Sequence, residues 1–181
     1  MYSVRLHGRG GQGIVTTAEL LAAAVFAEGG HAQAFPTFGS ERTGAPVAAY
    51  CRIDAAAIRT HEPITAPDAL IVADATLFDQ VDVLAGLRPE GLVVVNATVC
   101  PPALQGRSGV VLVPASDIAQ RWIGRPVPGT ALLGAFEARS GTVGMVSLTA
   151  AIRQRFPASV AAANAAAAQE AFDVIAEAVH V

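Results

Sequence analysis

Residues 6–17 read LHGRGGQGIVTT, and the glycines at positions 8, 10 and 13 match the pattern G-x-G-x-x-G. Residues 2–7, before them, alternate apolar and polar side chains, which is typical of a strand. Residues 14–28, after them, have the spacing of a helix that ends at Gly29. A strand, a glycine turn and a helix in this order predict the first unit of an α/β sheet, because glycines permit a tight turn and close packing of the helix on the strand.

Short apolar runs later in the chain predict further strands that are buried on both faces of a parallel sheet. The predicted strands after the first are residues 31–38, 47–53, 70–73, 92–95 and 110–113, and the predicted helices are 76–87, 116–123, 130–138, 147–156 and 159–179. Ser147 is expected to cap its helix. The alternation predicts a single α/β domain over residues 1–181 with a Rossmann-like, open, mostly parallel sheet, helices on both faces and a helical C-terminal third.

The composition narrows the class of protein. Hydrophobic residues make up 52% and charged residues 15%, so we expect some apolar surface to be buried against a partner. The net charge is −3 and there is no basic run, which argues against a nucleic-acid partner. No signal peptide is visible, and the most apolar stretch, residues 20–27, is far shorter than the ~20 residues of a membrane span. A soluble cytoplasmic protein is therefore expected.

The glycine loop admits three interpretations. Its backbone N–H groups and the following helix N-terminus could bind a phosphate or pyrophosphate, with Gln12 as a side-chain donor and Arg9 either supplying charge or facing water. It could bind NAD, but such sites place Asp or Glu about 20 residues further on, and residues 30–38 contain neither. The glycines could also serve only the packing of strand on helix. The first interpretation is favoured.

A second polar stretch lies between Gly39 and Gly44, and its residues are Ser40, Glu41, Arg42 and Thr43. It follows the second predicted strand, so it should lie beside the glycine loop at the carboxyl edge of the sheet, where Arg42 could clamp a phosphate. The alternative is a solvated turn with a Glu41–Arg42 surface pair.

No catalytic set and no metal site is predicted. The histidines are scattered, and the only cysteines, Cys51 and Cys100, form no C-x-x-C pair, so they are expected to be small buried residues. Asp74 and Asp79 could bind a metal but are better explained by a helix start and an exposed helix face. Trp122 and Phe136 are expected to anchor the core or an interface.

The stretches HGRGGQGIVTTAELLAAA and FPTFGSERTGAPVAAYCRI together resemble the gamma subunit of 2-oxoacid:ferredoxin oxidoreductases, the pyruvate:ferredoxin oxidoreductase superfamily. PDALIVADATLF, GLVVVNAT, TALLGAF and SLTAAIRQRF are similar to later blocks of that family, so the resemblance covers essentially the whole chain. One departure is Gly129, where the family often has Asn before the TALLGAF-like helix.

The resemblance implies a subunit of a heteromeric enzyme that oxidatively decarboxylates a 2-oxoacid to an acyl-CoA. Thiamine diphosphate, magnesium and iron–sulfur clusters would lie on partner alpha, beta and ferredoxin-like delta subunits, with ferredoxin or another acceptor taking the electrons. This chain would help to hold coenzyme A. The residues that the resemblance implicates are Gly8, Arg9, Gly10, Gly11, Gln12 and Gly13, with Arg42 as a second contact. Ser40, Glu41 and Thr43 are included as candidate binding residues because they share the polar turn of Arg42. A stand-alone NAD(P)-binding oxidoreductase and a purely structural interaction subunit remain the alternatives.

Overall fold

The computed structural model describes residues 1–37, 43–60 and 62–178. These residues contain a six-stranded sheet in the order β2-β3-β1-β4-β5-β6. The strands are β1 (Tyr2–Arg9), β2 (His31–Pro36), β3 (Pro46–Asp54), β4 (Ala69–Val72), β5 (Leu92–Asn96) and β6 (Val110–Val113). β1, β4, β5 and β6 pair in parallel, whereas β3 is antiparallel to both of its neighbours, β1 and β2. The predicted α/β class and mostly parallel sheet are confirmed.

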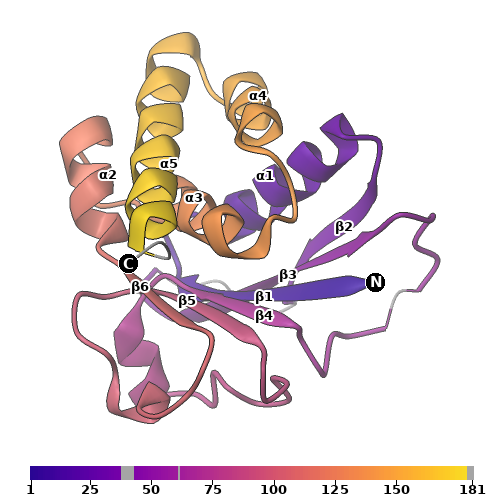
Figure 1. The fold of residues 1–181 in the computed structure, drawn as a ribbon, viewed down its shortest axis with the longest axis vertical. Helices are drawn as coiled ribbons and strands as arrows, with labels where there is room; N and C mark the ends of the chain where they lie inside the picture. Colours follow the sequence, from indigo (N-terminus) through magenta and orange to yellow (C-terminus); the bar gives the residue numbers. More distant parts are fainter. Residues whose placement is uncertain (38–42, 61, 179–181) are drawn as a thin grey trace.

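The α-helices gather on one face of the sheet (Figure 1). They are α1 (Ile14–Ala27), α2 (Ala115–Ile123), α3 (Gly129–Ser140), α4 (Met145–Arg155) and α5 (Ala158–Ala178). The opposite face is covered by loops and two 3₁₀ turns, η1 (Ala75–Asp79) and η2 (Pro102–Leu104). The expectation of helices on both faces is therefore wrong for the described residues, although both faces are covered. No helix among these residues is both long and apolar enough to cross a membrane.

The strands bury side chains on both faces because successive residues point to opposite sides of a sheet. Towards the α-helices, Val4, Leu6 and Ile71 are completely buried in the larger core. Towards the 3₁₀ turns, Leu70 and Val72 belong to a second, smaller core. This two-sided burial explains the continuous apolar runs that predicted β4, β5 and β6.

The predicted helix over residues 76–87 does not form beyond the η1 turn. The backbone carbonyls of Val83 and Ala85 instead accept hydrogen bonds from Arg5 Nη2, at 2.9 and 2.7 Å. A longer α-helix would engage these carbonyls in its own bonds. Gly86 has a φ of 70° and lies so close to Thr65 that a Cβ would sit 1.8 Å from that residue's carbonyl oxygen. The segment is thus shaped by a buried arginine of β1, which local sequence does not reveal.

Ser147 was expected to cap a helix, but α4 begins two residues earlier, at Met145, and its N-cap residue is Gly144. Ser147 thus lies within α4, which has no side-chain cap, and the predicted serine cap is wrong. The Gly144 N–H donates to Glu28 Oε1 at 2.6 Å, so a carboxylate at the end of α1 holds the residue that precedes α4.

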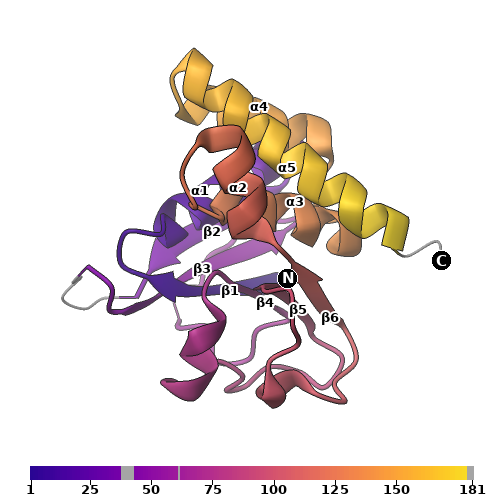
Figure 2. The same cartoon turned by 90° about the vertical axis from the view of Figure 1, so that its left-hand side faces the viewer.

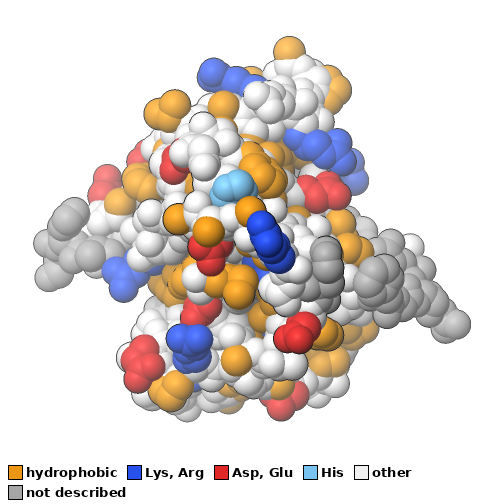
Figure 3. Space-filling view, turned by 90° about the vertical axis from the view of Figure 1, so that its right-hand side faces the viewer, with side chains coloured by type: hydrophobic (Ala, Val, Ile, Leu, Met, Phe, Trp, Pro, Cys, Tyr) orange, Lys and Arg blue, Asp and Glu red, His pale blue; other side chains and the backbone are white. Residues whose placement is uncertain are grey.

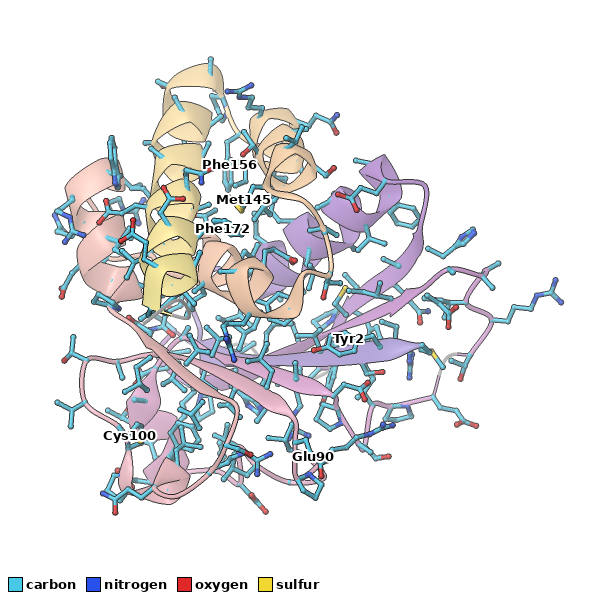
Figure 4. All side chains as sticks on the ribbon, viewed as in Figure 1. Tyr2, Glu90, Cys100, Met145, Phe156 and Phe172 are labelled. Carbon is cyan, nitrogen blue, oxygen red and sulfur yellow. The ribbon has the colours of Figure 1, made fainter. Side chains whose placement is uncertain are left out.

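The helices α3 and α5 approach each other at backbone distance. A Cβ on Gly134 would lie 1.9 Å from the carbonyl oxygen of Ala168, so only glycine fits there. Ala161, Ala168 and Ala171 are buried on α5 beside it. Larger side chains occupy the neighbouring gap, where Met145 and Phe156 lie between α4 and α5 (Figure 4). The alanine-rich sequence of α5 is thus explained by close helix packing as well as by helix propensity.

Candidate functional site

The parallel strands bring the glycine loop to the carboxyl edge of the sheet, which Figure 2 faces. Gly11 and Gly13 have φ angles of 95° and 72°, which side chains rarely adopt. Gly8 is required for a different reason, because a Cβ there would lie 2.5 Å from the side chain of Ile14. Two glycines therefore shape the turn, and the third lets α1 pack on β1, as in a dinucleotide-type loop.

Gln12 closes the loop from inside. The side-chain Oε1 of Gln12 accepts a hydrogen bond from the backbone N–H of Arg9 at 2.7 Å. The backbone N–H of Gln12 donates to the Arg9 carbonyl oxygen at 3.0 Å. The amide oxygen thus stabilises the turn. Donation from the other end of this amide to a ligand stays a prediction.

The turn before β3 lies directly against the glycine loop. Gly10 N–H donates to the Ala45 carbonyl oxygen at 2.9 Å, and Gly44 N–H donates to the Gly10 carbonyl oxygen at 3.1 Å. Gly10 also forms a parallel bridge with Thr43. The expected proximity of the two stretches is confirmed at Thr43, whereas Ser40, Glu41 and Arg42 lie outside the described residues.

The loop leads into a helix that has no side-chain cap. Gly13 is the N-cap residue of α1 and cannot supply one, so the first-turn N–H groups have no acceptor within the helix. A pocket of about 410 Å³ opens here. Most of its lining comes from the glycine loop and the first turn of α1, and the strands β2 and β3 supply the rest. The lining residues are Arg9, Gly10, Gly11, Gly13, Ile14, Val15, Thr16, Pro36 and Val47. Free N–H groups and the positive end of the helix dipole suit an anion.

Arg9 does not project freely into this pocket. Its guanidinium contacts three groups: Nε lies 2.7 Å from Asp74 Oδ2, Nη1 donates to the Gly44 carbonyl oxygen at 3.0 Å, and Nη2 donates to Thr76 Oγ1 at 2.7 Å. Burial alone would raise the pKa of Asp74, but hydrogen bonds from Thr76 and Arg9 outweigh it and leave the pKa below its usual value. These contacts differ from the expectation that Arg9 supplies charge to a ligand or faces water, because three protein groups already bind its guanidinium.

Asp74 and Thr76 carry the signal by which the network could have been found. Asp74 is the N-cap residue of η1, and its side chain accepts from the Thr76 N–H at 3.0 Å. The spacing Asp-x-Thr after a buried strand is a local turn signature. The interpretation of Asp74 as the start of a helical turn is confirmed, and no cluster of metal-ligating side chains occurs among the residues that the structure describes.

The two cysteines are free thiols that form no disulfide. Cys51 is buried, and burial together with the charge of Glu137 raises its pKa to about 12, so the thiolate does not form near neutral pH. Cys100 is only half-buried. Phe136 is completely buried, as expected of a core anchor, whereas the Trp122 side chain is 50% exposed.

Two further buried groups are polar. Glu137 is 2% exposed, and burial raises its pKa to about 7. Its Oε2 accepts a hydrogen bond from the Val143 N–H at 2.8 Å, whereas its Oε1 has no partner among the described residues. Burial, aided by the Arg5 charge, lowers the pKa of His7 to about 4. Both lie away from the pocket lining, so neither is assigned to the site.

Gly129 adjoins the base of the site. A Cβ at this position would lie 2.3 Å from Thr17 Oγ1 on α1. The Thr17 hydroxyl donates to the Gly13 carbonyl oxygen at 3.0 Å, so it supports the loop from below. A larger residue at 129 therefore requires Thr17 to move.

On the opposite edge of the sheet, the described residues form no cluster of like charge. The opposite, amino-terminal edge of the sheet is seen in Figure 3, where acidic and basic side chains are interspersed rather than gathered by sign. The carboxyl edge thus belongs to a Rossmann-like domain, and the chemistry of its glycine loop suits an anionic ligand.

Comparison with known proteins agrees with this description. Residues 3–174 match the family model described as pyruvate ferredoxin/flavodoxin oxidoreductase. The pyruvate/ketoisovalerate oxidoreductases common subunit gamma of Thermococcus kodakarensis is 45% identical over 178 residues, covering 96% of each chain. The crystal structure of pyruvate oxidoreductase subunit PORC from Thermotoga maritima superposes with a TM-score of 0.82 at 33% identity and covers 95% of each chain.

A third match concerns the fold alone. The 2-oxoglutarate:ferredoxin oxidoreductase of Magnetococcus marinus, solved with 2-oxoglutarate, coenzyme A and succinyl-CoA bound, has a TM-score of 0.75 at 21% identity. It covers 98% of this chain but only 31% of its own length. The same fold thus occurs as one part of a longer polypeptide.

The chain belongs to the pyruvate ferredoxin/flavodoxin oxidoreductase family. Within it, the chain is a gamma subunit of a pyruvate or 2-oxoacid ferredoxin oxidoreductase complex, and thus a component of an oxidoreductase. The alternative of a stand-alone nicotinamide enzyme is wrong.

Proposed function

We propose that the pocket at the glycine loop holds the phosphate-bearing part of coenzyme A while the partner subunits carry out the redox chemistry. The observation that carries this proposal is the uncapped N-terminus of α1 behind a loop with two positive-φ glycines. Coenzyme A brings a pyrophosphate and a 3′-phosphate, which match backbone N–H donors and need no ribose-binding carboxylate. The Magnetococcus enzyme, which contains this fold, has coenzyme A bound.

The direct contacts in this proposal are the backbone N–H groups of Gly11, Gly13 and the first turn of α1. Gly10 lines the approach to them, while its own N–H stays bonded to Ala45. Arg42 is proposed as a second, charged contact, with Ser40, Glu41 and Thr43 in the same turn. Gly8 and Gln12 act by shaping the loop, through close packing and an internal hydrogen bond. No catalytic residue is assigned to this chain.

The complete reaction is the oxidative decarboxylation of a 2-oxoacid to an acyl-CoA. Thiamine diphosphate with magnesium would form the acyl carrier on the alpha and beta subunits, and iron–sulfur clusters on the partner subunits, including the delta subunit, would pass electrons to ferredoxin or another acceptor. This chain binds and orients the coenzyme A that receives the acyl group. A cytoplasmic location fits this soluble assembly.

The test uses the assembled complex and the variant Gly11→Ala. A Cβ at Gly11 meets no atom within 4 Å, so it would enter the open pocket, where it obstructs the approach of phosphate to the backbone. We expect the KM for coenzyme A to rise about tenfold or more, the scale of one lost charge-assisted contact, while the KM for the 2-oxoacid is unchanged.

Gly29→Ala is the matched control. Gly29 also has a positive φ, 79°, and open space around its Cβ position, but it lies at the far end of α1. Both substitutions strain the backbone to a similar extent, so only a direct role in binding separates them. Equal KM values for coenzyme A in the two variants would overturn the proposal and favour a purely structural subunit.

A further inference from the structure

The Arg9 side chain at the loop joins three chain segments, which are its own strand and two others. Arg9 ends β1, Gly44 precedes β3, and Asp74 with Thr76 follows β4. The guanidinium spans all of them with three different nitrogen atoms, at distances of 2.7, 3.0 and 2.7 Å. A planar fork of donors can satisfy such an arrangement, whereas a single ammonium cannot.

The partners of Arg9 are themselves held in place. Thr76 Oγ1 donates to Asp74 Oδ1 at 2.6 Å, and the Thr76 N–H donates to the same oxygen. The side chains of Arg9 and Asp74 are 22% and 19% exposed, so water competes with their ion pair only in part. The network is a rigid connection rather than a loose surface pair.

The positive charge of Arg9 is paired within the protein. The Asp74 carboxylate faces the guanidinium directly, and two further acceptors occupy its other nitrogen atoms. These three contacts hold the guanidinium against the protein and leave one N–H on each terminal nitrogen, so Arg9 offers a phosphate fewer donors than an unpaired arginine would. The N–H groups of Gly11, Gly13 and the first turn of α1, in contrast, are available without rearrangement.

We infer that Arg9 is a positioning residue that clamps the glycine loop to the turn before β3 and to Asp74, and that it does not contact coenzyme A. This inference rests on the proposed function of the loop. The clamp fixes Gly10 between Arg9 and the residue 43–45 turn, so it determines whether the loop N–H groups converge on one anion.

The variant Asp74→Asn in the assembled complex distinguishes a positioning role of Arg9 from a direct contact with coenzyme A. The two roles predict different changes in the KM for coenzyme A. If Arg9 is a clamp, loss of the carboxylate loosens the loop and the KM for coenzyme A rises about fivefold or more. If Arg9 binds phosphate, removal of its competing counter-ion leaves that KM unchanged or lowers it. Thr76→Val, which removes one acceptor at similar volume, is expected to act in the same direction as Asp74→Asn, but less.

Two Arg9 variants sharpen the comparison. Arg9→Lys keeps a charge that binds phosphate well but cannot span three partners, so the clamp predicts a KM close to that of Arg9→Gln, and direct contact predicts near-native binding. A clamp also predicts the same fold-change for coenzyme A and for 3′-dephospho-coenzyme A. Finally, Arg9→Gln combined with Asp74→Asn should be no worse than Arg9→Gln alone, because both belong to one network.

Arg88→Gln is the control, since Arg88 forms an ion pair with Asp68 at 3.2 Å at an exposed position away from the pocket. The clamp predicts a raised KM for coenzyme A with kcat retained at saturation, and no such change in the control. A lowered KM in Asp74→Asn, or rescue by Arg9→Lys, would overturn the inference. If Gly11→Ala also leaves the KM unaltered, the proposed coenzyme A site itself fails, which is a distinguishable result.

Discussion

Gly134→Ala provides a direct test of how closely α3 and α5 pack. The new Cβ would lie 1.9 Å from the Ala168 carbonyl oxygen and 2.7 Å from its carbonyl carbon. Ordinary contacts are about 3.5 Å, so α5 would have to shift by more than about 1 Å. Backbone atoms cannot rotate away as a flexible side chain would.

Two effects of opposite sign compete in this substitution. Alanine is favoured over glycine in a helix interior by about 1 kcal/mol. Overpacking typically costs 1–3 kcal/mol, and a clash with backbone lies at the upper end of that range or beyond. We therefore expect a net loss of about 2 kcal/mol in the free energy of unfolding and, for a chain of this size, a fall in Tm of roughly 4–8 °C.

The assay is urea and thermal unfolding of the purified chain, followed by circular dichroism. Ala162→Gly on the exposed face of α5 is the control, because it reports the propensity difference without a packing change. A Gly134→Ala chain that is as stable as the native one, or more stable, would show that the helices are further apart than described and would refute this reasoning.

Three further outcomes are expected. Glu137→Gln should stabilise the chain above pH 7. Burial raises the pKa of Glu137 to about 7, so the folded chain keeps a proton that the unfolded chain loses near pH 4.5. The stability of the native chain therefore falls as pH rises from about 4.5 to 7, and the variant avoids this loss. His7, with its pKa lowered to about 4, titrates in the opposite sense, so the readout is the difference in Tm between variant and native chain from pH 5 to 8. Arg42→Ala should raise the KM for coenzyme A in the complex roughly tenfold, and an unchanged KM in an intact complex would contradict its role. Thr130→Val should cost about 1–3 kcal/mol in urea unfolding, because the buried Asn164 Oδ1 loses the hydroxyl that donates to it at 3.0 Å; a neutral result would mean that another donor replaces it.

The local sequence pattern was sufficient to predict segments whose conformation depends on their own spacing of apolar residues. The residue 110–113 strand has the predicted bounds, and α1 begins at Ile14 as its spacing predicts. The pattern failed where a distant group decides the conformation. Arg5 draws the carbonyls of residues 83 and 85 out of a helix, and Glu28 holds Gly144, the residue before α4, from 116 positions away.

The candidate site shows the same division. The glycine turn, the uncapped helix and the neighbouring turn could be predicted, because each depends on short motifs and on the rule that ligands meet parallel strands at their carboxyl ends. The role of Arg9 could not, since its partner Asp74 lies 65 positions away and becomes a neighbour only through the pairing of β1 with β4.

The close contact of α3 with α5 limits side-chain volume rather than chemical identity. Positions such as Ala161 and Ala171 can therefore drift among the smallest residues over long evolutionary times, whereas any branched side chain would push the helices apart.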